Sequence, residues 1–209
     1  NRLAFSAEQR VAEGEDVARF SPLFIDGLCG TGETHLLQGV ARRFLERQRA
    51  GGAAPGRTLC RYITAESFTN EFIAAVKVGK VDAFRKSYRK VALLCLDDVH
   101  FFSSKEATQT ELLHTFDAIG LEGARIVMAS DEHPREIRKL SSALVSRFMS
   151  GAVVRLDPPD AALRVKLLET LGKRRGLHLS LEALRVLSGH LGVGGSGAGG
   201  GVTVRDLEG

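Results

Sequence analysis

The stretch Gly27–Thr34 is a glycine-rich turn that lies between an apolar run, Pro22–Ile25, and a helical pattern, His35–Val40. Its spacing matches the phosphate-binding loop G-x-x-x-x-G-K-S/T except at one position. Glycines allow the positive φ angles that such a loop needs, and its backbone N–H groups then face an anion at the start of the next helix. The sequence therefore predicts a strand, a phosphate-binding loop and a helix, in that order.

The exception is Glu33, which stands where the pattern has lysine. That lysine contacts the β- and γ-phosphates, while the next residue, here Thr34, holds Mg²⁺ through its hydroxyl. A carboxylate at the lysine position replaces attraction to the phosphates by repulsion. Two unit charges 4 Å apart interact by about 4 kcal/mol at an effective dielectric constant of 20. Glu33 avoids this repulsion if its side chain points away from the phosphates or is protonated. The sequence leaves open whether nucleotide binds and is hydrolysed, and the simpler alternative is a glycine turn that only starts a helix.

Apolar runs and helical patterns alternate between residues 20 and 156. Strands are expected at 20–26, 59–63, 91–96, 125–129 and 152–156, and helices at 34–50, 65–78, 81–88, 105–120 and 140–148. The run 91–96 is continuously apolar, which is typical of a strand buried on both faces. Strands that alternate with helices form a parallel sheet. The predicted fold class is therefore α/β, a P-loop domain whose sheet is covered by helices on both faces.

Beyond residue 157 only helical patterns remain. One begins at Asp160, a second covers 180–188, and a capping box at 203–206 opens a third. A glycine-rich insertion, 192–201, precedes the last of them. We expect the P-loop domain at 1–157, with a helix at 1–13, and a small helical lid at 158–209.

The composition is that of a globular protein with a mild excess of positive charge. The 209 residues carry a formal net charge of +4, and no apolar run approaches the roughly 18 residues of a membrane span. Cys29, Cys60 and Cys95 lie in or beside apolar runs, so we expect reduced thiols in the core of a cytoplasmic protein. The chain starts at Asn1 and stops within a helical pattern, and we expect it to be a fragment.

Acidic residues follow two of the expected strands. Asp97 and Asp98 end the run 91–96, and Asp131 follows the strand at 125–129. Ligands of open α/β sheets bind at the carboxyl ends of the strands. A carboxylate there can hold Mg²⁺, its neighbour can orient an attacking water, and Asp131 can sense the γ-phosphate. The alternatives are acids in a surface turn, and a turn or capping role for Asp131 before Pro134.

A basic cluster lies between the expected strands at 59–63 and 91–96. Residues 77–90 contain six Lys and Arg residues and one acid, Asp82. The aromatic residues Phe84 and Tyr88 lie within this range, and Phe72 lies shortly before it. Clustered cations neutralise phosphates, and exposed aromatic side chains stack on unpaired bases. The alternative is a solvated helix face whose aromatic residues lie in the core. Candidate DNA contacts are Lys77, Lys80, Arg85, Lys86 and Arg89.

Together these segments resemble the ATPase domain of the bacterial chromosomal replication initiator DnaA, an AAA+ family. The loop region resembles the Walker A motif, Leu96–Phe102 resembles Walker B, and Ser146–Phe148 resembles the arginine-finger motif. The remaining similar segments are the initiator-specific helices at 65–72 and 84–89, sensor 1 at 130–137 and sensor 2 at 204–209.

The resemblance implies an ATPase module that assembles head to tail when it binds ATP and contacts origin and single-stranded DNA during replication initiation. A replicative helicase is a further candidate partner. It implies ATP or ADP as ligand, with Mg²⁺ held by Thr34 and Asp97. It also implies that Asp98 polarises water, that Asp131 and Arg205 sense nucleotide, and that Arg147 acts on the neighbouring subunit. The nucleotide-binding residues would be Gly27, Gly30, Thr31, Gly32, Glu33, Thr34 and His35.

Three positions depart from the family pattern: Glu33, Ala107 and Ala143. In the family a basic residue is usual at the position of Ala107, and an arginine at that of Ala143. These departures keep two alternatives open. One is a non-enzymatic DnaA-like adaptor with impaired nucleotide binding, and the other is an ATPase of the helicase-loader or transposition-helper type. The initiator-like block 65–89 argues against the second alternative.

Overall fold

The computed structural model describes residues 21–51, 58–121, 123–193 and 204, with only the backbone of 190–193. These residues fall into two compact units. The first comprises 21–26 and 33–155, and the second comprises the loop 27–32 and the segment from 156 onward. The helix expected at 1–13, most of the insertion 192–201 and the sensor residue Arg205 lie outside the described residues.

Five strands form a single sheet, as predicted from the alternating pattern. In chain order they are β1 (Leu23–Gly27), β2 (Thr58–Thr64), β3 (Val91–Asp97), β4 (Arg125–Ser130) and β5 (Ala152–Leu156). The order across the sheet is β2-β3-β4-β1-β5, and the pairs β2/β3, β3/β4 and β4/β1 are parallel. The carboxyl ends of these four strands therefore meet at one edge, where Thr64 lies opposite Asp97 and Asp26 lies opposite Ser130.

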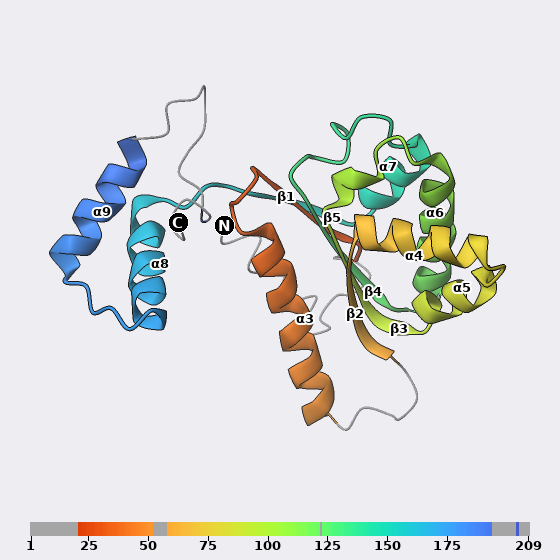
Figure 1. Cartoon of the computed structure of the whole chain (residues 1–209), viewed down its shortest axis with the longest axis horizontal. Coiled ribbons are helices and arrows are strands. Elements are labelled where there is room, and N and C mark those ends of the chain that lie inside the picture. Colours follow the sequence, from red (N-terminus) through yellow and green to blue (C-terminus); the bar gives the residue numbers. More distant parts are fainter. Residues whose placement is uncertain (1–20, 52–57, 122, 194–203, 205–209) are drawn as a thin grey trace. The chain divides into compact units, whose positions relative to one another are not determined.

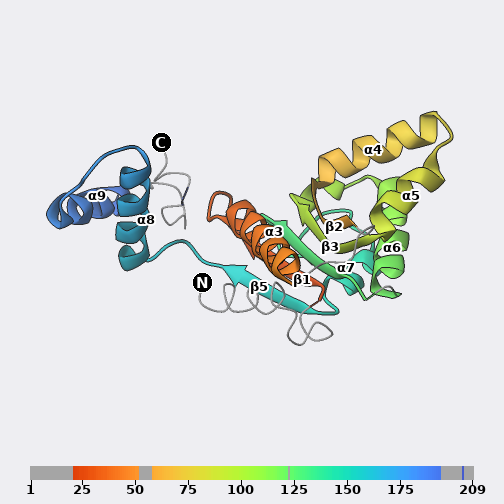
Figure 2. The same cartoon turned by 90° about the horizontal axis from the view of Figure 1, so that it is seen from below.

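Helices cover both faces of the sheet because successive strand residues point to opposite sides. On one face, Phe24, Leu94 and Met128 are buried in a large apolar core with side chains of four helices, α4 (Ala65–Lys77), α5 (Val81–Arg89), α6 (Glu106–Leu121) and α7 (Ser142–Phe148). On the other face, α3 (Glu33–Ala50) packs against β2, β3 and β4 (Figures 1 and 2). This arrangement confirms the predicted coverage.

Two helix starts show how the local sequence sets the boundaries. The Thr64 hydroxyl accepts a hydrogen bond from the Ser67 N–H at 3.1 Å and so caps the start of α4. A short 3-10 helix, η1 (Val99–Phe102), follows β3 and was not predicted. Its four residues are too few to show a helical period, so the sequence pattern could not identify it.

The second unit contains two helices, α8 (Ala161–Arg174) and α9 (Leu181–Val193). Asp160 caps α8 by accepting the Leu163 N–H at 2.8 Å, as predicted. Leu168 and Leu184 are buried against each other and bring the two helices together. In the described part of the chain, none of the helices combines the length and the apolar character that a membrane crossing requires.

The cysteines differ from the sequence expectation in one respect. Cys95 is buried in β3 and Cys60 is partly buried in β2, but Cys29 is exposed, and none of the three forms a disulfide. Cys29 was expected in the core because it follows an apolar run. It lies instead in the loop after β1, where the chain has left the sheet.

Candidate functional site

The loop after β1 has the backbone that a phosphate-binding turn requires. Gly30 and Gly32 have φ angles of 85° and 108°, in the left-handed region that glycine adopts without steric cost. The turn is closed by a hydrogen bond of 3.0 Å from the Thr31 N–H to the Leu28 carbonyl. A Cβ on Gly32 would lie 3.7 Å from Cγ2 of Val204, an ordinary van der Waals distance, so Val204 packs near the loop backbone.

The first residues of α3 place the unusual glutamate away from solvent. Glu33 is the first helical residue and its side chain is buried, with 6% exposure, whereas Thr34 and His35 are exposed. The positive end of the helix dipole favours a carboxylate at this position. The Thr34 hydroxyl therefore remains accessible at the start of α3, while the Glu33 charge is not presented to solvent beside it.

Asp97 is the last residue of β3 and is held by two hydrogen bonds. Its side chain is 2% exposed. Oδ1 accepts the N–H of Asp98 at 3.0 Å, and Oδ2 accepts the hydroxyl of Tyr62 from the neighbouring strand β2. Burial, and then the hydrogen bond to Asp97, raise the pKa of the Tyr62 hydroxyl above its usual value, so the phenol keeps its proton and acts as a donor. The sequence singled out Asp97 but not Tyr62.

The other predicted acids lie near the same edge in different settings. Asp98 is partly exposed and has a left-handed backbone, with φ 54° and ψ 44°, at the start of η1. This turn brings its N–H onto the carboxylate of Asp97. Asp131 follows β4 and is exposed. The Ser130 hydroxyl accepts the Glu132 N–H at 3.3 Å, so Ser130, rather than Asp131, makes the turn contact there.

Asp26 is a buried carboxylate at this edge that sequence reasoning missed. It precedes the loop, has 5% exposure, and its Oδ1 has no hydrogen-bond partner within the described part of the chain. Burial raises the pKa of Asp26, against the opposing charges of His133 and Arg155. The signal in the sequence was an acid that directly follows the apolar run of β1.

A divalent cation fits the strand-end residues. Among the described residues no three His, Cys, Asp or Glu side chains gather into a metal cluster. Mg²⁺ does not need one, because it binds one or two carboxylates together with phosphate oxygens and water. Asp97 supplies an oriented carboxylate that retains lone pairs, and Thr34 supplies an exposed hydroxyl.

Arg147, the candidate residue for a neighbouring subunit, forms an ion pair within its own chain. It lies in the last turn of α7, and its Nη2 is 2.7 Å from Oδ1 of Asp117 on α6. Both side chains are about half exposed, so the pair can be broken at little cost. Asp117 was not singled out from the sequence, because its proximity to Arg147 depends on how α6 and α7 pack.

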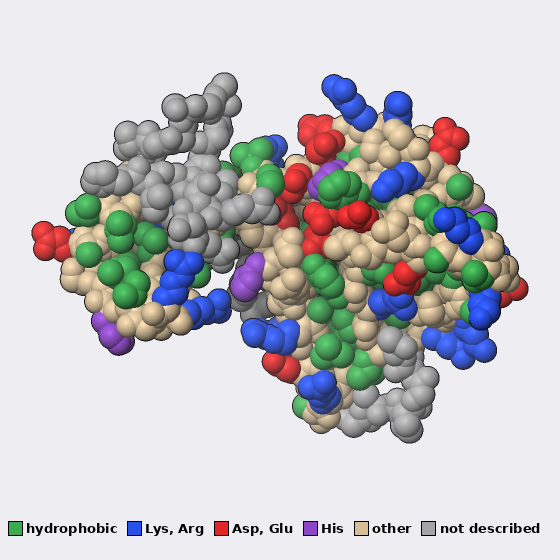
Figure 3. Space-filling view, in the orientation of Figure 1, with side chains coloured by type: hydrophobic (Ala, Val, Ile, Leu, Met, Phe, Trp, Pro, Cys, Tyr) green, Lys and Arg blue, Asp and Glu red, His purple; other side chains and the backbone are tan. Residues whose placement is uncertain are grey.

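The candidate DNA contacts lie at the end of α4 and along α5. Lys77, Lys80, Lys86 and Arg89 are exposed, and Figure 3 shows Lys and Arg side chains gathered over α5. A cavity of about 420 Å³ lies between the charged residues of α5. It is lined by Asp82, Arg85, Lys86, Arg89 and Lys90.

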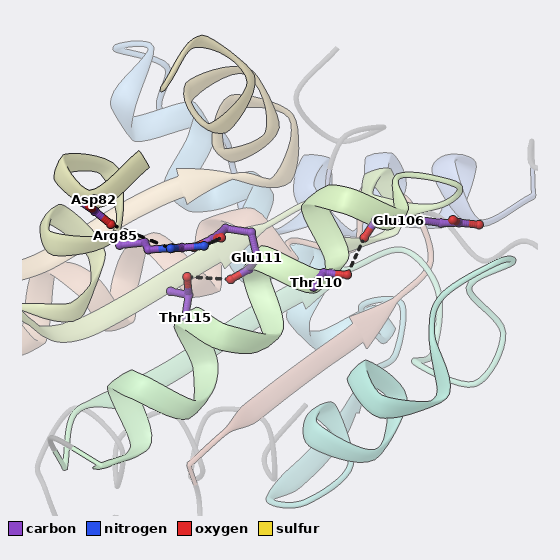
Figure 4. Close-up of polar contacts among 6 residues, drawn as sticks. All are labelled: Asp82, Arg85, Glu106, Thr110, Glu111 and Thr115. Carbon is purple, nitrogen blue, oxygen red and sulfur yellow. Dashed lines mark hydrogen bonds and ion pairs between the residues drawn. The ribbon is translucent and has the colours of Figure 1, made fainter. Parts of the chain in front are cut away.

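Arg85 differs from its basic neighbours because it is bound to a buried acid. Its Nε and Nη2 donate to the two carboxylate oxygens of Glu111 on α6, at 2.9 and 2.7 Å (Figure 4). The Glu111 side chain is 4% exposed. This bidentate pair fastens α5 to α6 and raises the pKa of the Arg85 guanidinium. Arg85 therefore helps to hold the basic surface in place, in addition to any contact that it makes with DNA.

The aromatic residues of the basic cluster lie in the core. Tyr88 and Phe84 are buried, and Phe72 is partly buried against them, with Phe84–Tyr88 ring centroids 4.7 Å apart. The expectation that they are exposed for base stacking is wrong, because Phe84 and Tyr88 share the inward face of α5. The exposed apolar side chains of this region are Ile73, Val76 and Val78 instead.

These features agree with the comparisons with known proteins. A family model described as the bacterial DnaA ATPase domain matches residues 1–155. The chain belongs to the bacterial DnaA ATPase-domain family. The chromosomal replication initiator protein DnaA of Lactiplantibacillus plantarum is 38% identical over 191 residues, which are 91% of this chain and 40% of that protein. The chain thus spans about two fifths of the length of this relative.

Solved structures of DnaA proteins have the same fold. Domain III of the Thermotoga maritima replication initiation protein DnaA superposes with a TM-score of 0.84 and 32% identity, covering all of this chain and 80% of that chain. A replication initiator DnaA bound to AMPPCP and single-stranded DNA superposes with a TM-score of 0.82 and 32% identity, covering all of this chain and 59% of that chain. The predicted AAA+ fold of a DnaA domain is therefore confirmed.

Proposed function

We propose that this chain is the ATP-dependent module of a replication initiator, which binds Mg²⁺ with ATP or ADP, assembles head to tail and holds single-stranded DNA. The observation that carries the proposal is Asp97, a buried carboxylate oriented by two donors at the carboxyl edge of a parallel sheet. The DnaA that binds AMPPCP and single-stranded DNA supports the choice of ligands.

The nucleotide side of the proposal assigns roles to this chain's own residues. The backbone N–H groups of the loop, including Gly30 and Gly32, would face phosphate oxygens, and Thr34 and Asp97 would hold Mg²⁺. The bound metal would neutralise charge that develops on the phosphates. Asp98 would orient a water, and Asp131 and Arg205 would sense the nucleotide. The Glu33 carboxylate would repel the phosphates, and the loop N–H groups and Mg²⁺ would have to outweigh this repulsion.

The DNA side rests on the surface of α4 and α5. Lys77, Lys80, Lys86 and Arg89 supply exposed cations for phosphates, and Ile73 and Val76 supply an exposed apolar face one helical turn apart on α4. Unpaired bases present apolar faces to such side chains, whereas a duplex hides them. We therefore propose that this surface holds single-stranded DNA, with Arg85 acting mainly by keeping α5 in place.

The assembly side rests on Arg147. Its half-exposed guanidinium is held by Asp117 in this chain, and it would exchange this partner for the γ-phosphate bound to a neighbouring copy. The exchange replaces one charged hydrogen-bond acceptor by another, and the ion pair that is lost is of the weak, exposed class.

The test is assembly on oligo(dT) with AMPPCP and Mg²⁺, measured by mass photometry for the native chain, Arg147→Ala and Asp117→Ala. Both variants lose the ion pair, but only the first loses the guanidinium. We expect the native chain and Asp117→Ala to assemble, and Arg147→Ala to need at least about tenfold more protein, which corresponds to about 1.4 kcal/mol. If the native chain does not assemble with AMPPCP, or if both variants fail equally, the proposal is wrong.

A non-enzymatic adaptor of the same family is the second candidate, and Glu33 is the observation that favours it. An adaptor would bind oligo(dT) or itself equally well with and without AMPPCP. The same measurement without nucleotide separates the two candidates, because the proposed module should assemble only when nucleotide is present.

A further inference from the structure

The hydroxyl of Tyr62 is directed at the most buried acid of the strand edge. In the pairing of β2 with β3, Tyr62 lies opposite Cys95 and Thr64 lies opposite Asp97, so Tyr62 is the diagonal neighbour of Asp97 on the same face. It donates to Oδ2 of Asp97. The hydroxyl thus joins β2 to β3.

Packing does not explain a tyrosine at this position. Tyr62 is 38% exposed and does not belong to the buried apolar core, whereas the other tyrosine, Tyr88, is fully buried in it. Tyr88 also donates to a carboxylate, that of Glu71 at 2.7 Å, but Glu71 is about half exposed and lies on α4 rather than at the end of a strand. The two tyrosines therefore make the same kind of bond in opposite settings.

We propose that Tyr62 is a positioning residue, which holds the carboxylate of Asp97 in the orientation that binds a divalent cation. The N–H of Asp98 holds one oxygen and the Tyr62 hydroxyl holds the other, so the carboxylate cannot rotate. Each oxygen accepts one hydrogen bond and keeps one lone pair for a metal or a metal-bound water. Partners that orient a metal ligand in this way typically contribute 10–100-fold to metal affinity.

This inference rests on the proposed nucleotide function, since Asp97 is assigned to the metal there. The test uses the whole chain, with Mn²⁺ as the cation and AMPPCP as the nucleotide, and free Mn²⁺ is counted by electron paramagnetic resonance. We compare the native chain with Tyr62→Phe and with Tyr88→Phe, which removes a matched tyrosine–carboxylate hydrogen bond from the core. Thermal unfolding of each chain reports on structural effects.

We expect Tyr62→Phe to weaken Mn²⁺ binding by about tenfold or more. Its affinity for AMPPCP without metal should stay close to that of the native chain, and its melting temperature should fall because the buried carboxylate of Asp97 loses a donor. Tyr88→Phe should also lower the melting temperature, but its Mn²⁺ affinity should stay within about twofold of the native value, because its partner Glu71 is not a metal ligand. A structural role alone would not separate the two variants in this way.

Three results would overturn the inference. If the native chain binds Mn²⁺ with AMPPCP and Tyr62→Phe binds it equally well, the positioning role is wrong while the nucleotide function stands. If Tyr62→Phe and Tyr88→Phe weaken Mn²⁺ binding to the same extent, the effect is a general loss of structure. If the native chain binds no Mn²⁺ with AMPPCP, the nucleotide function is wrong and the role of Tyr62 fails with it.

Discussion

The carboxyl edge of the sheet and the basic surface of α4 and α5 are built in opposite ways. At the edge, one buried carboxylate, that of Asp97, is held by donors from its own backbone neighbour and from an adjacent strand. On the surface, Lys77, Lys80, Lys86 and Arg89 are exposed side chains, and a single basic residue, Arg85, is tied to a buried acid.

The two regions should respond differently to substitution. A buried, oriented group loses its role when one partner is removed, because water cannot replace that partner. Exposed cations act nearly independently, since each contributes its own screened interaction with phosphate. We therefore expect single substitutions to disable the edge, but only to weaken the surface, unless they remove the ion pair that holds α5 in place.

The ion pair beneath the basic surface gives the largest expected effect on stability. Glu111→Gln removes the charge that binds Arg85 and should lower the free energy of unfolding by about 2 kcal/mol, because the bond to a charged group is lost in a buried place. Glu106→Gln on the same helix is the control, since Glu106 is exposed (Figure 4), and it should change the free energy by less than about 0.5 kcal/mol. Urea unfolding measures both, and equal effects would refute the special role of Glu111.

Removing exposed cations should give the next largest effect. It should weaken DNA binding at the basic surface without changing Mn²⁺ binding at the strand edge. Lys86→Ala combined with Arg89→Ala should weaken oligo(dT) binding in the presence of AMPPCP and reduce the slope of log K against log salt by about 1.4, or about 0.7 per lost phosphate contact. Fluorescence anisotropy at several salt concentrations measures this. The Mn²⁺ affinity should not change. A loss of Mn²⁺ binding, or an unchanged salt slope, would contradict the separation of the surface from the edge.

The smallest expected effect concerns Asp26, the acid at the edge whose Oδ1 has no partner in the described part of the chain. Burial raises its pKa in the folded chain above the usual value of 3.8. The folded state then holds the proton more tightly than the unfolded state, so this group's contribution to stability is greatest below about pH 4 and is lost as pH rises through the folded pKa. Asp26→Asn should raise the free energy of unfolding at pH 7 by about 1 kcal/mol.

A pH series of urea unfolding checks the assignment to Asp26. The gain from Asp26→Asn should shrink as the pH falls toward 4, because the native side chain becomes neutral there as well. A gain that is constant across the series, or a loss of stability at pH 7, would show that Asp26 is ionised and satisfied in the folded chain.

The sequence predicted the features that depend on local patterns. The apolar run at 91–96 placed β3 within one residue, and the acid that follows it, Asp97, was expected at the strand end. Partners from distant segments were not predictable. Tyr62 meets Asp97 only because β2 and β3 pair in one register, and Glu111 meets Arg85 only because α6 packs beside α5. The basic residues around Tyr88 suggested that its ring is exposed. Tyr88 is buried, because its position in the helix puts it on the inward face of α5.

We propose that this chain binds nucleotide through the strand edge although Glu33 replaces lysine. The most direct measurement is calorimetry of ATP and ADP with Mg²⁺, on the native chain, Glu33→Lys and Asp97→Asn. We predict micromolar, Mg²⁺-dependent binding to the native chain, about tenfold tighter binding to Glu33→Lys because repulsion becomes attraction, and loss of the Mg²⁺ dependence in Asp97→Asn. If the native chain binds neither nucleotide while Glu33→Lys binds both, the account is contradicted and the site is a vestige.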